Sequence, residues 1–449
     1  MLKLQQIVHG TIQKLDENGN GILFCRKNKV LVRHALLHEE LDARIIKESK
    51  QGYIAEIVHI QQPSHLRVKP PCPHAAICGG CQLQHMAYPA QLEWKKQQII
   101  HALKKERLSL HIHDVMPSDR EGYRNKMIIG FSKDSKGKII AGLYEEYSHR
   151  IVPYQNCLLH PKECDEIIPS IVSLIQRLRI EPFDRKKRRG ILRHVQIRYG
   201  KETKQILLTF VVSQKQFPGQ KQLVQQIARL HPDIRSIVFN VNTRDTSVVL
   251  GKEEWTAYGK GWIEDRLLGK TFRISSTSFY QINHDQCERL YQKAYELLQP
   301  RPSDRILDAY CGIGTIGLCI ASKVKQVIGV EVNQQAVMDA GINAKNNQIH
   351  NARFIAQDAS RFMLQEAKHK QHYDAIILDP PREGSTPVFL DACVQLKTKK
   401  IVYISCNPFT QLRDIAYLAK KGYACKEMFL YDMFPMSAHV ESVVLLERM

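Results

Sequence analysis

Several features of membrane and secreted proteins are missing from this chain of 449 residues. No uninterrupted apolar run reaches the ~18 residues that a membrane-spanning helix needs. The first ten residues lack the apolar core of a secretory signal peptide. Internal repeats and low-complexity tracts are absent as well. We therefore expect a cytoplasmic protein without membrane contact, divided into two or three domains because its length exceeds that of one ordinary core.

Acidic residues are scarce relative to basic ones, with 45 Asp and Glu against 65 Lys and Arg and a formal net charge of +20. A surplus of this size favours a polyanionic partner, because basic side chains that neutralise phosphates release condensed counterions. No amphipathic basic helix or lipidation motif appears, so nucleic acid is favoured over a membrane surface. No segment points to an obligate protein partner.

The pattern of apolar residues changes along the chain. Residues 1–66 read as short strands separated by turn signals, which is typical of a compact β-barrel. Residues 67–276 combine a cysteine-rich loop, a helix over 91–105 and a helix over 163–178 with several strands. We expect a barrel followed by a central α+β domain.

From residue 277 to 449, apolar strands alternate with helical stretches. The expected strands are 305–307, 327–330, 375–378 and 401–404. Such alternation predicts a doubly wound, mostly parallel sheet of the Rossmann-like kind. The predicted fold class is therefore multidomain α/β.

Three cysteines lie close together in the central segment. Cys72, Cys78 and Cys81 have the spacing C-x5-C-x2-C, with two glycines between the last two. Disulfides are rare in the cytoplasm, so this spacing favours a metal site. A fourth ligand is needed, and Cys157, His74 and His85 are candidates. Four thiolates suit a [4Fe–4S] cluster and a Cys/His mixture suits zinc, and the spacing leaves both open.

A glycine-rich turn follows the first strand of the C-terminal region. Gly312-x-Gly314-x-x-Gly317 lets a ligand approach the backbone at the carboxyl edge of the sheet. Glu331 ends the next strand, where a carboxylate can hold ribose hydroxyls. A nicotinamide dinucleotide and S-adenosylmethionine both fit this pattern.

Two further motifs follow strands of the same region and suggest covalent chemistry. Asp379-Pro380-Pro381-Arg382 lacks the aromatic residue that amino-group methyltransferases place at its end. Cys406 follows the strand 401–404, and Glu441 precedes the last strand. Addition of a Cys406 thiolate to carbon 6 of uracil would activate carbon 5 for methylation, and Glu441 could then remove the carbon 5 proton.

Nearly the whole chain resembles the RNA uracil-5-methyltransferase family, in particular its iron–sulfur, TRAM-containing type that modifies 23S ribosomal RNA. Residues 78–85 match the family's cluster loop C-G-G-C-x-x-Q-H, and residues 278–283 match its donor motif. Residues 1–66 resemble a TRAM domain, although Leu37-His38-Glu39-Glu40 departs from the usual Pro-Gly-Glu turn. A further signature, residues 123–126, carries no assigned role.

The resemblance implies specific roles for ten residues. The nucleophile would be Cys406 and the base Glu441, the donor contacts would be Gln281, Tyr310, Glu331 and Asp379, and the [4Fe–4S] ligands would be Cys72, Cys78, Cys81 and Cys157. The implied domains are 1–66, 67–276 and 277–449, with 93–123 packing on the catalytic domain. S-adenosylmethionine would be the methyl donor.

Ribosomal RNA is the expected partner, and the T-loop of transfer RNA is the alternative target for the same chemistry. Two more distant alternatives remain. A nicotinamide-dependent iron–sulfur oxidoreductase would use the glycine turn but leave Cys406 and Glu441 without a role. A non-catalytic RNA-binding assembly factor would bind RNA without turnover.

Overall fold

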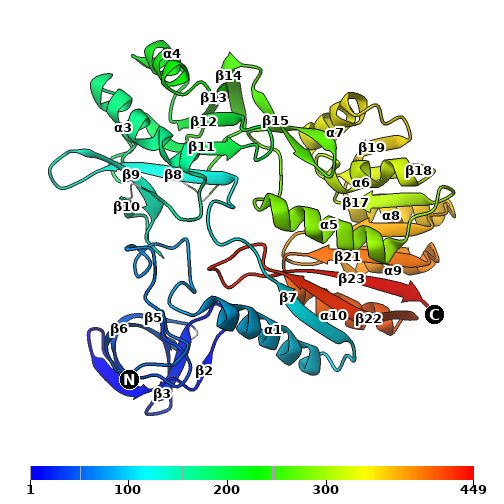
Figure 1. Cartoon of the computed structure of the whole chain (residues 1–449), viewed down its shortest axis with the longest axis horizontal. Helices are drawn as coiled ribbons and strands as arrows, with labels where there is room; N and C mark the ends of the chain where they lie inside the picture. The colour runs from blue at the N-terminus through cyan, green and yellow to red at the C-terminus, as the bar shows by residue number, and fades with distance from the viewer. Residues whose placement is uncertain (1, 51, 147, 154–155, 245, 247) are drawn as a thin grey trace.

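The computed structural model of the chain describes residues 2–50, 52–146, 148–153, 156–244, 246 and 248–449. Tyr154 and Gln155, which precede Cys157, lie outside the described residues. Four sheets are formed by the described strands, so the fold is mixed α/β as predicted (Figure 1). Within the described part of the chain, no helix combines the length and the apolarity needed to cross a membrane.

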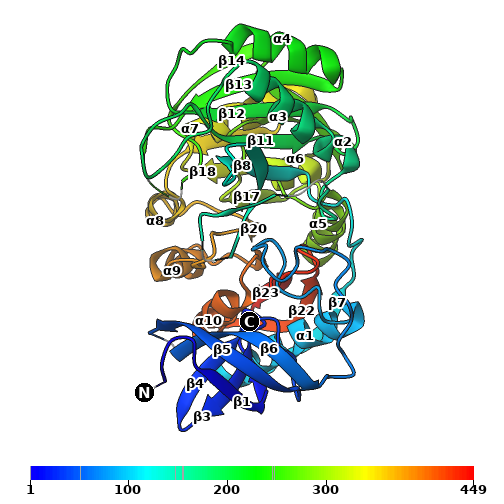
Figure 2. The same cartoon turned by 90° about the vertical axis from the view of Figure 1, so that its left-hand side faces the viewer.

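The first sheet is formed near the N-terminus and curls around its own core (Figure 1 and Figure 2). Its strands, in spatial order, are β1 (Ile7–Thr11), β5 (Glu40–Ser49), β6 (Gly52–Gln62), β4 (Asn28–Val32), β3 (Gly21–Cys25) and β2 (Lys14–Leu15). Strand β5 alternates buried and partly buried residues over its first six positions, as expected for a strand with one face on a core.

The second sheet occupies the middle of the chain. Its strands, in spatial order, are β10 (Ile151–Pro153), β9 (Ile139–Tyr144), β8 (Lys126–Lys133), β11 (Leu192–Tyr199), β12 (Ile206–Val212), β13 (Ile234–Val241) and β14 (Glu253–Gly259). Every residue of β12 is buried, which fits a central strand covered on both faces. One face packs on α3 (Ile167–Arg177) and α4 (Gln220–Leu230).

The helix expected over 163–178 is interrupted. A short helix α2 (Lys162–Asp165) ends before α3 begins at Ile167. Pro169 lies in the first turn of α3, where its missing N–H costs no helical hydrogen bond, whereas in a continuous helix it would remove one.

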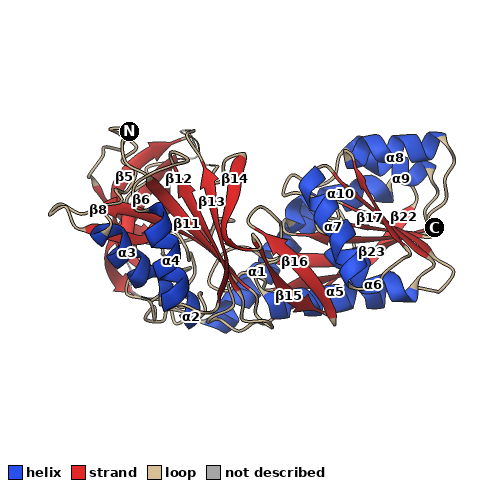
Figure 3. Ribbon diagram, turned by 90° about the horizontal axis from the view of Figure 1, so that it is seen from above, coloured by secondary structure: helices blue, strands red, loops and turns tan. Residues whose placement is uncertain are grey.

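The third and fourth sheets lie in the other lobe of the molecule (Figure 3). A hairpin of β15 (Trp262–Leu267) and β16 (Lys270–Ser275) precedes all strands of the main sheet except β7 in the sequence. The main sheet has the order β19 (Ala352–Ala356), β18 (Gln326–Glu331), β17 (Arg305–Ala309), β20 (Ala375–Leu378), β21 (Lys400–Ser405), β23 (Glu441–Arg448), β22 (Tyr423–Tyr431) and β7 (His111–Met116). Strands β19 to β21 are parallel, and β23 is antiparallel to both of its neighbours.

Helices cover both faces of this sheet. Those on one face are α1 (Tyr88–Lys105), α8 (Ala359–Lys368), α9 (Pro387–Gln395) and α10 (Pro408–Ala419). Those on the other are α5 (His284–Leu298), α6 (Thr315–Ile320) and α7 (Gln334–Asn346), and a 3-10 turn (Ala321–Lys323) follows α6. Side-chain caps begin five of these helices and fix where each loop ends; the capping residues are Asn283, Asn333, Asp358, Thr386 and Asn407.

Helix α1 and strand β7 join the C-terminal lobe although they come from early in the chain (Figure 1). The Lys95 ammonium on α1 lies 2.5 Å from the Asp432 carboxylate, and both side chains are buried. Tyr88 donates a hydrogen bond of 2.8 Å to the other oxygen of Asp432. This pair holds α1 against the loop between β22 and β23, which leads directly to Glu441.

Substitution of Lys95 by Met is expected to destabilise the C-terminal lobe by about 3–5 kcal/mol, because it leaves the Asp432 charge buried without its partner. Urea unfolding followed by tryptophan fluorescence measures this change, since Trp94 lies on the same helix. Lys96→Met is the matched control, because Lys96 pairs with Asp114, whose side chain is 91% exposed. Equal stability of the two variants would show that the buried pair is dispensable.

Candidate active site

A glycine turn joins β17 to α6 at the carboxyl edge of the main sheet. Gly312 and Gly314 have φ values of +55° and +81°, and Tyr310 has +66°. Such values are ordinary for glycine and uncommon for tyrosine. No atom lies within 4 Å of the place where a Cβ of Gly312 would be. A ligand can therefore approach the backbone of this turn.

Glu331 holds the glycine turn against the end of the neighbouring strand. Its carboxylate accepts hydrogen bonds from the N–H of Gly312 (3.2 Å) and of Asn333 (2.9 Å). Behind the turn, Asp308 accepts a hydrogen bond of 2.8 Å from the N–H of Gly317, and burial raises the Asp308 pKa to about 7. The turn, β18 and the start of α6 are thus fixed relative to one another.

The other two expected donor contacts are Asp379 and Gln281. Asp379 follows β20, and burial raises its pKa to about 7. Gln281 precedes α5, and its backbone carbonyl accepts a hydrogen bond of 2.9 Å from the Asn125 amide. Asn125 belongs to the signature 123–126 that the sequence left without a role, and it fixes the loop that carries Gln281.

Cys406 lies between the end of β21 and the start of α10. The following residue, Asn407, caps α10 and also donates a hydrogen bond of 2.9 Å to the Arg382 carbonyl. Burial, and then the nearby carboxyls of Glu441 and Asp379, raise the pKa of the Cys406 thiol to about 12, while Arg382 lowers it. The charges of Glu441, Asp379 and Arg382 therefore all act on the Cys406 thiol.

Glu441 begins β23, whose antiparallel register sets Ser442 beside Ser405. This register brings Glu441 next to Cys406, although 35 positions separate them in the sequence. The Glu441 side chain is buried, at 1% exposure, and its Oε2 has no hydrogen-bond partner among the described residues. Burial, then Asp379, raise the Glu441 pKa well above its ordinary value. A buried carboxyl with a free oxygen is suited to accept a proton.

Arg382 is a site residue whose role the sequence did not reveal. Its positive charge lowers the pKa of both Cys406 and Glu441, so it lies near both groups. Its loop is held by Asp414 on α10, which accepts a hydrogen bond of 2.8 Å from the Ser385 N–H. The available signal was the charged residue directly after Asp379-Pro380-Pro381.

The four cysteines expected to bind a cluster line one cavity of about 600 Å³. All four are free of disulfides. Of the three candidates for the fourth ligand, Cys157 lines this cavity, whereas His74 and His85 do not. Burial raises the pKa of Cys81 to about 11 and that of Cys157 to about 12. The chemistry of this donor set fits an all-thiolate cluster.

No metal-binding group of three or more His, Cys, Asp or Glu residues is found within the part of the chain that the structure describes. The cluster ligands therefore stay a prediction, as do the roles expected for the catalytic and donor-binding residues.

Comparisons with known proteins show to which family the chain belongs. A model of the family described as tRNA (Uracil-5-)-methyltransferase matches residues 87–449. An uncharacterized RNA methyltransferase of Staphylococcus aureus (strain MSSA476) is 38% identical over 442 residues, which cover 97% of each chain. Another, from Halalkalibacterium halodurans, is 36% identical over 444 residues, with 98% of this chain and 97% of the relative covered.

A solved structure is similar over almost the full length. It is the tRNA (uracil-54, C5)-methyltransferase of Pyrococcus abyssi in complex with S-adenosyl-L-homocysteine, with a TM-score of 0.80, 29% identity, and coverage of 98% of this chain and 99% of that one. These matches confirm the predicted family and exclude the oxidoreductase and the non-catalytic factor. The chain belongs to the tRNA (uracil-5-)-methyltransferase family and is an S-adenosylmethionine-dependent RNA (uracil-5-)-methyltransferase.

Proposed function

We propose that this enzyme methylates carbon 5 of a specific uridine in RNA through a covalent adduct with Cys406. S-adenosylmethionine supplies an electrophilic methyl group, and Gln281, Tyr310, Glu331 and Asp379 bind it beside the glycine turn. The observation that carries the proposal is the placement of Cys406 beside Glu441 by the register of β21 and β23.

The reaction needs one nucleophile and one base. The Cys406 thiol loses its proton to solvent, and its sulfur bonds to carbon 6 of uracil, which moves the electron pair of the C5–C6 double bond toward carbon 5. Carbon 5 then forms a bond to the methyl group of the donor, while the bond between this methyl group and the sulfonium sulfur breaks and S-adenosylhomocysteine is left. Glu441 removes the carbon 5 proton, the S–C6 bond breaks, and the C5–C6 double bond is restored. Because carbons 5 and 6 are stacked in folded RNA, the uridine must be flipped into the site.

The direct test supplies labelled S-adenosylmethionine with unmodified ribosomal RNA and, separately, with unmodified transfer RNA. Digestion and mapping of the product locate the methyl group. The expected product is 5-methyluridine at a discrete position. Absence of this nucleoside from both RNAs would contradict the proposal.

The same experiment identifies the target. We propose 23S ribosomal RNA, on the resemblance of the cysteine loop and the N-terminal sheet to the TRAM-containing type. The T-loop of transfer RNA is the second candidate, because the similar structure from Pyrococcus abyssi is named as a tRNA methyltransferase for uracil 54. If 5-methyluridine formed in transfer RNA alone, the proposed reaction would stand and transfer RNA would be the substrate.

The rate of adduct formation and methyl transfer is expected to rise with pH between about 6 and 9. Burial raises the pKa of the Cys406 thiol to about 12 and that of Glu441 well above its ordinary value. Both groups react in their deprotonated forms, so each shift lowers the active fraction at low pH and both effects have the same sign. Single-turnover rates measured by rapid quench test this, with donor affinity measured over the same range as a control. A flat or falling profile would contradict the assignment.

We propose further that Cys72, Cys78, Cys81 and Cys157 hold a [4Fe–4S] cluster. The support is their position around one cavity and their freedom from disulfides. The methyl transfer needs no electron donor or acceptor, so we assign the cluster a structural or RNA-positioning role. In this proposal residues 1–66 form the TRAM-type RNA-binding barrel, residues 67–276 the central domain and residues 277–449 the catalytic domain, with 93–123 packed on the latter.

Anaerobically purified protein is expected to contain about four iron and four acid-labile sulfide atoms per chain. Cys157→Ser should lose most of this iron, whereas Cys25→Ser should keep it, because Cys25 does not line the cavity. Iron and sulfide assays give the result. RNA affinity should fall in Cys157→Ser while the Cys406 adduct still forms at saturating RNA. Undiminished iron in Cys157→Ser would refute the assignment of the fourth ligand.

A further inference from the structure

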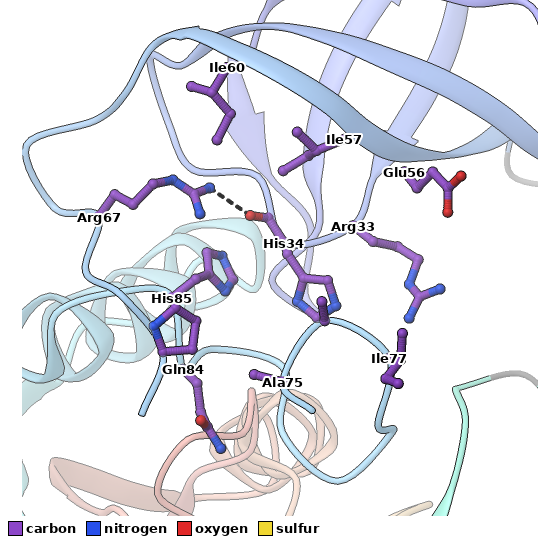
Figure 4. Close-up of a pocket in the computed structure, with 12 residues that line it drawn as sticks. Arg33, His34, Glu56, Ile57, Ile60, Arg67, Ala75, Ile77, Gln84 and His85 are labelled. Atoms are coloured by element: carbon purple, nitrogen blue, oxygen red, sulfur yellow. Dashed lines mark hydrogen bonds between the residues drawn. The ribbon is translucent and has the colours of Figure 1, made fainter. Parts of the chain in front are cut away.

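A second cavity, of about 380 Å³, lies between the N-terminal sheet and the cysteine loop (Figure 4). Strand β6 forms one wall and the cysteine loop forms the opposite one (Figure 4). Its lining residues are Arg33, His34, Glu56, Ile57, Ile60, Arg67, Pro70, Ala75, Ala76, Ile77, Gln84 and His85. The volume is within the range of small-molecule sites, which starts at about 300 Å³.

Two histidines face this cavity with unused ring nitrogens. The rings of His34 and His85 lie edge to face, with centroids 5.5 Å apart and an interplanar angle of 88°. His85 is 3% exposed, and the Nε2 atoms of both rings are buried without a hydrogen-bond partner among the described residues. Buried polar atoms are normally paired, so two unpaired nitrogens at one cavity point to a ligand that completes them.

The charges around the cavity disfavour a phosphate. Arg67 is paired with Glu39 and donates a hydrogen bond of 2.7 Å to the His34 carbonyl. Arg33 is paired with Glu146 at 2.6 Å. Both guanidinium groups are thus paired with a carboxylate, although Arg33 Nε, like the two histidine nitrogens, is buried without a hydrogen-bond partner among the described residues. Glu56 adds a carboxylate to the lining, which repels anions.

The imidazoles add no positive charge at neutral pH. Burial, with the nearby charge of Arg33, lowers the pKa of His34 to about 4. Burial, with the neighbouring His34, lowers the pKa of His85 to about 3. A neutral imidazole offers one N–H donor and one acceptor nitrogen. The two imidazoles together therefore complement a neutral planar heterocycle that carries both hydrogen-bond donors and acceptors.

We propose that this cavity binds one unpaired nucleobase of the substrate RNA, distinct from the uridine that is methylated. The inference rests on the proposed function, because it assumes that RNA is bound across the N-terminal sheet and the cysteine loop. Ile57, Ile60 and Ala75 supply apolar walls for the faces of the base, and the histidines supply its hydrogen-bond partners. Sequence-specific RNA recognition commonly reads bases in this way, splayed out and held by stacking and edge contacts.

This cavity adjoins the cavity that the four cysteines line. Ala75 and Gln84 line both this cavity and the one that the cysteines share. The Gln84 side chain accepts a hydrogen bond of 3.3 Å from the Cys72 N–H. A base held here would therefore contact the same loop that carries three of the cysteines.

Ala76→Trp tests the proposal, because Ala76 is exposed and lines the cavity, so a large side chain there obstructs it without displacing a buried group. The control is Ala257→Trp, at an exposed alanine of β14 outside the cavity. The probe is the unmodified RNA that the wild type methylates, with affinity measured by gel retardation at several salt concentrations. Loss of one stacked base is expected to weaken binding by about tenfold. The salt dependence should stay unchanged, because no phosphate contact is lost.

Donor affinity and the rate at saturating RNA should also be unchanged in Ala76→Trp. A second variant, His85→Phe, keeps the ring and removes its hydrogen bonds, and we expect it to weaken RNA binding by several-fold. Full RNA affinity in both variants would overturn the proposal, as would a smaller salt dependence, which would indicate a phosphate site.

A base could come from the substrate RNA or from a free nucleotide. Titration of adenosine monophosphate and uridine monophosphate into the full chain distinguishes these two sources. Binding of a free nucleotide that Ala76→Trp abolishes, with RNA affinity intact, would overturn the RNA proposal. RNA affinity is measured without methyl transfer. Normal RNA binding by Ala76→Trp would therefore contradict only the base-binding cavity. Absence of 5-methyluridine from the RNA treated with the wild type would instead contradict the proposed function.

Discussion

Substitution of Cys406 by alanine is expected to lower methyl transfer by at least about 10⁴-fold, because the variant has no nucleophile to activate carbon 5. Affinity for RNA and for the methyl donor should be retained, since the side chain lies at a strand end and its loss removes only a thiol. Single-turnover methyl transfer measures the first quantity, and equilibrium binding measures the other two.

RNA that carries 5-fluorouridine at the target sharpens the Cys406 experiment. Fluorine cannot leave as a proton, so the wild type should accumulate an adduct that survives denaturation. Cys406→Ala should form none, whereas Cys425→Ala, at a cysteine of β22, should form it normally. An adduct of equal yield in Cys406→Ala would mean that another residue is the nucleophile.

Glu441→Gln is expected to separate methylation from release. The thiolate can still add and carbon 5 can still take the methyl group, but no carboxylate is present to remove the carbon 5 proton. Turnover should fall by about 10²–10⁴-fold, the usual contribution of a general base. A methylated RNA adduct bound through Cys406 should accumulate, visible as a slow band on denaturing gels and as the summed mass of protein and RNA.

Glu447→Gln is the matched control, since Glu447 lies on the same strand β23 and is exposed. It should turn over at the wild-type rate without adduct. Slow turnover of Glu441→Gln without a methylated adduct would place Glu441 at an earlier step. Normal turnover would leave its buried carboxyl without a catalytic role.

The sequence by itself determined the local elements of the catalytic lobe and the family. The apolar runs at 305–307, 327–330, 375–378 and 401–404 lie in β17, β18, β20 and β21. Runs of this kind are a property of neighbouring residues, and burial on both faces of a parallel sheet requires them. The helix expected over 91–105 is α1, extended by three residues to Tyr88 because Pro89 suits the first turn.

Tertiary structure decided which of these elements meet. Strand β7 pairs with β22, which lies more than 300 residues later in the sequence. The residues of His111–Met116 contain no pattern that predicts this pairing. The closeness of Glu441 to Cys406 depends on the register of β23 against β21. Arg382 lies near both, in a loop that is held by residues of α10 and its cap. The cavity of His34 and His85 likewise exists only where two distant segments pack. Local propensity is set by adjacent side chains, whereas register and cavities are set by long-range packing, which a single sequence does not display.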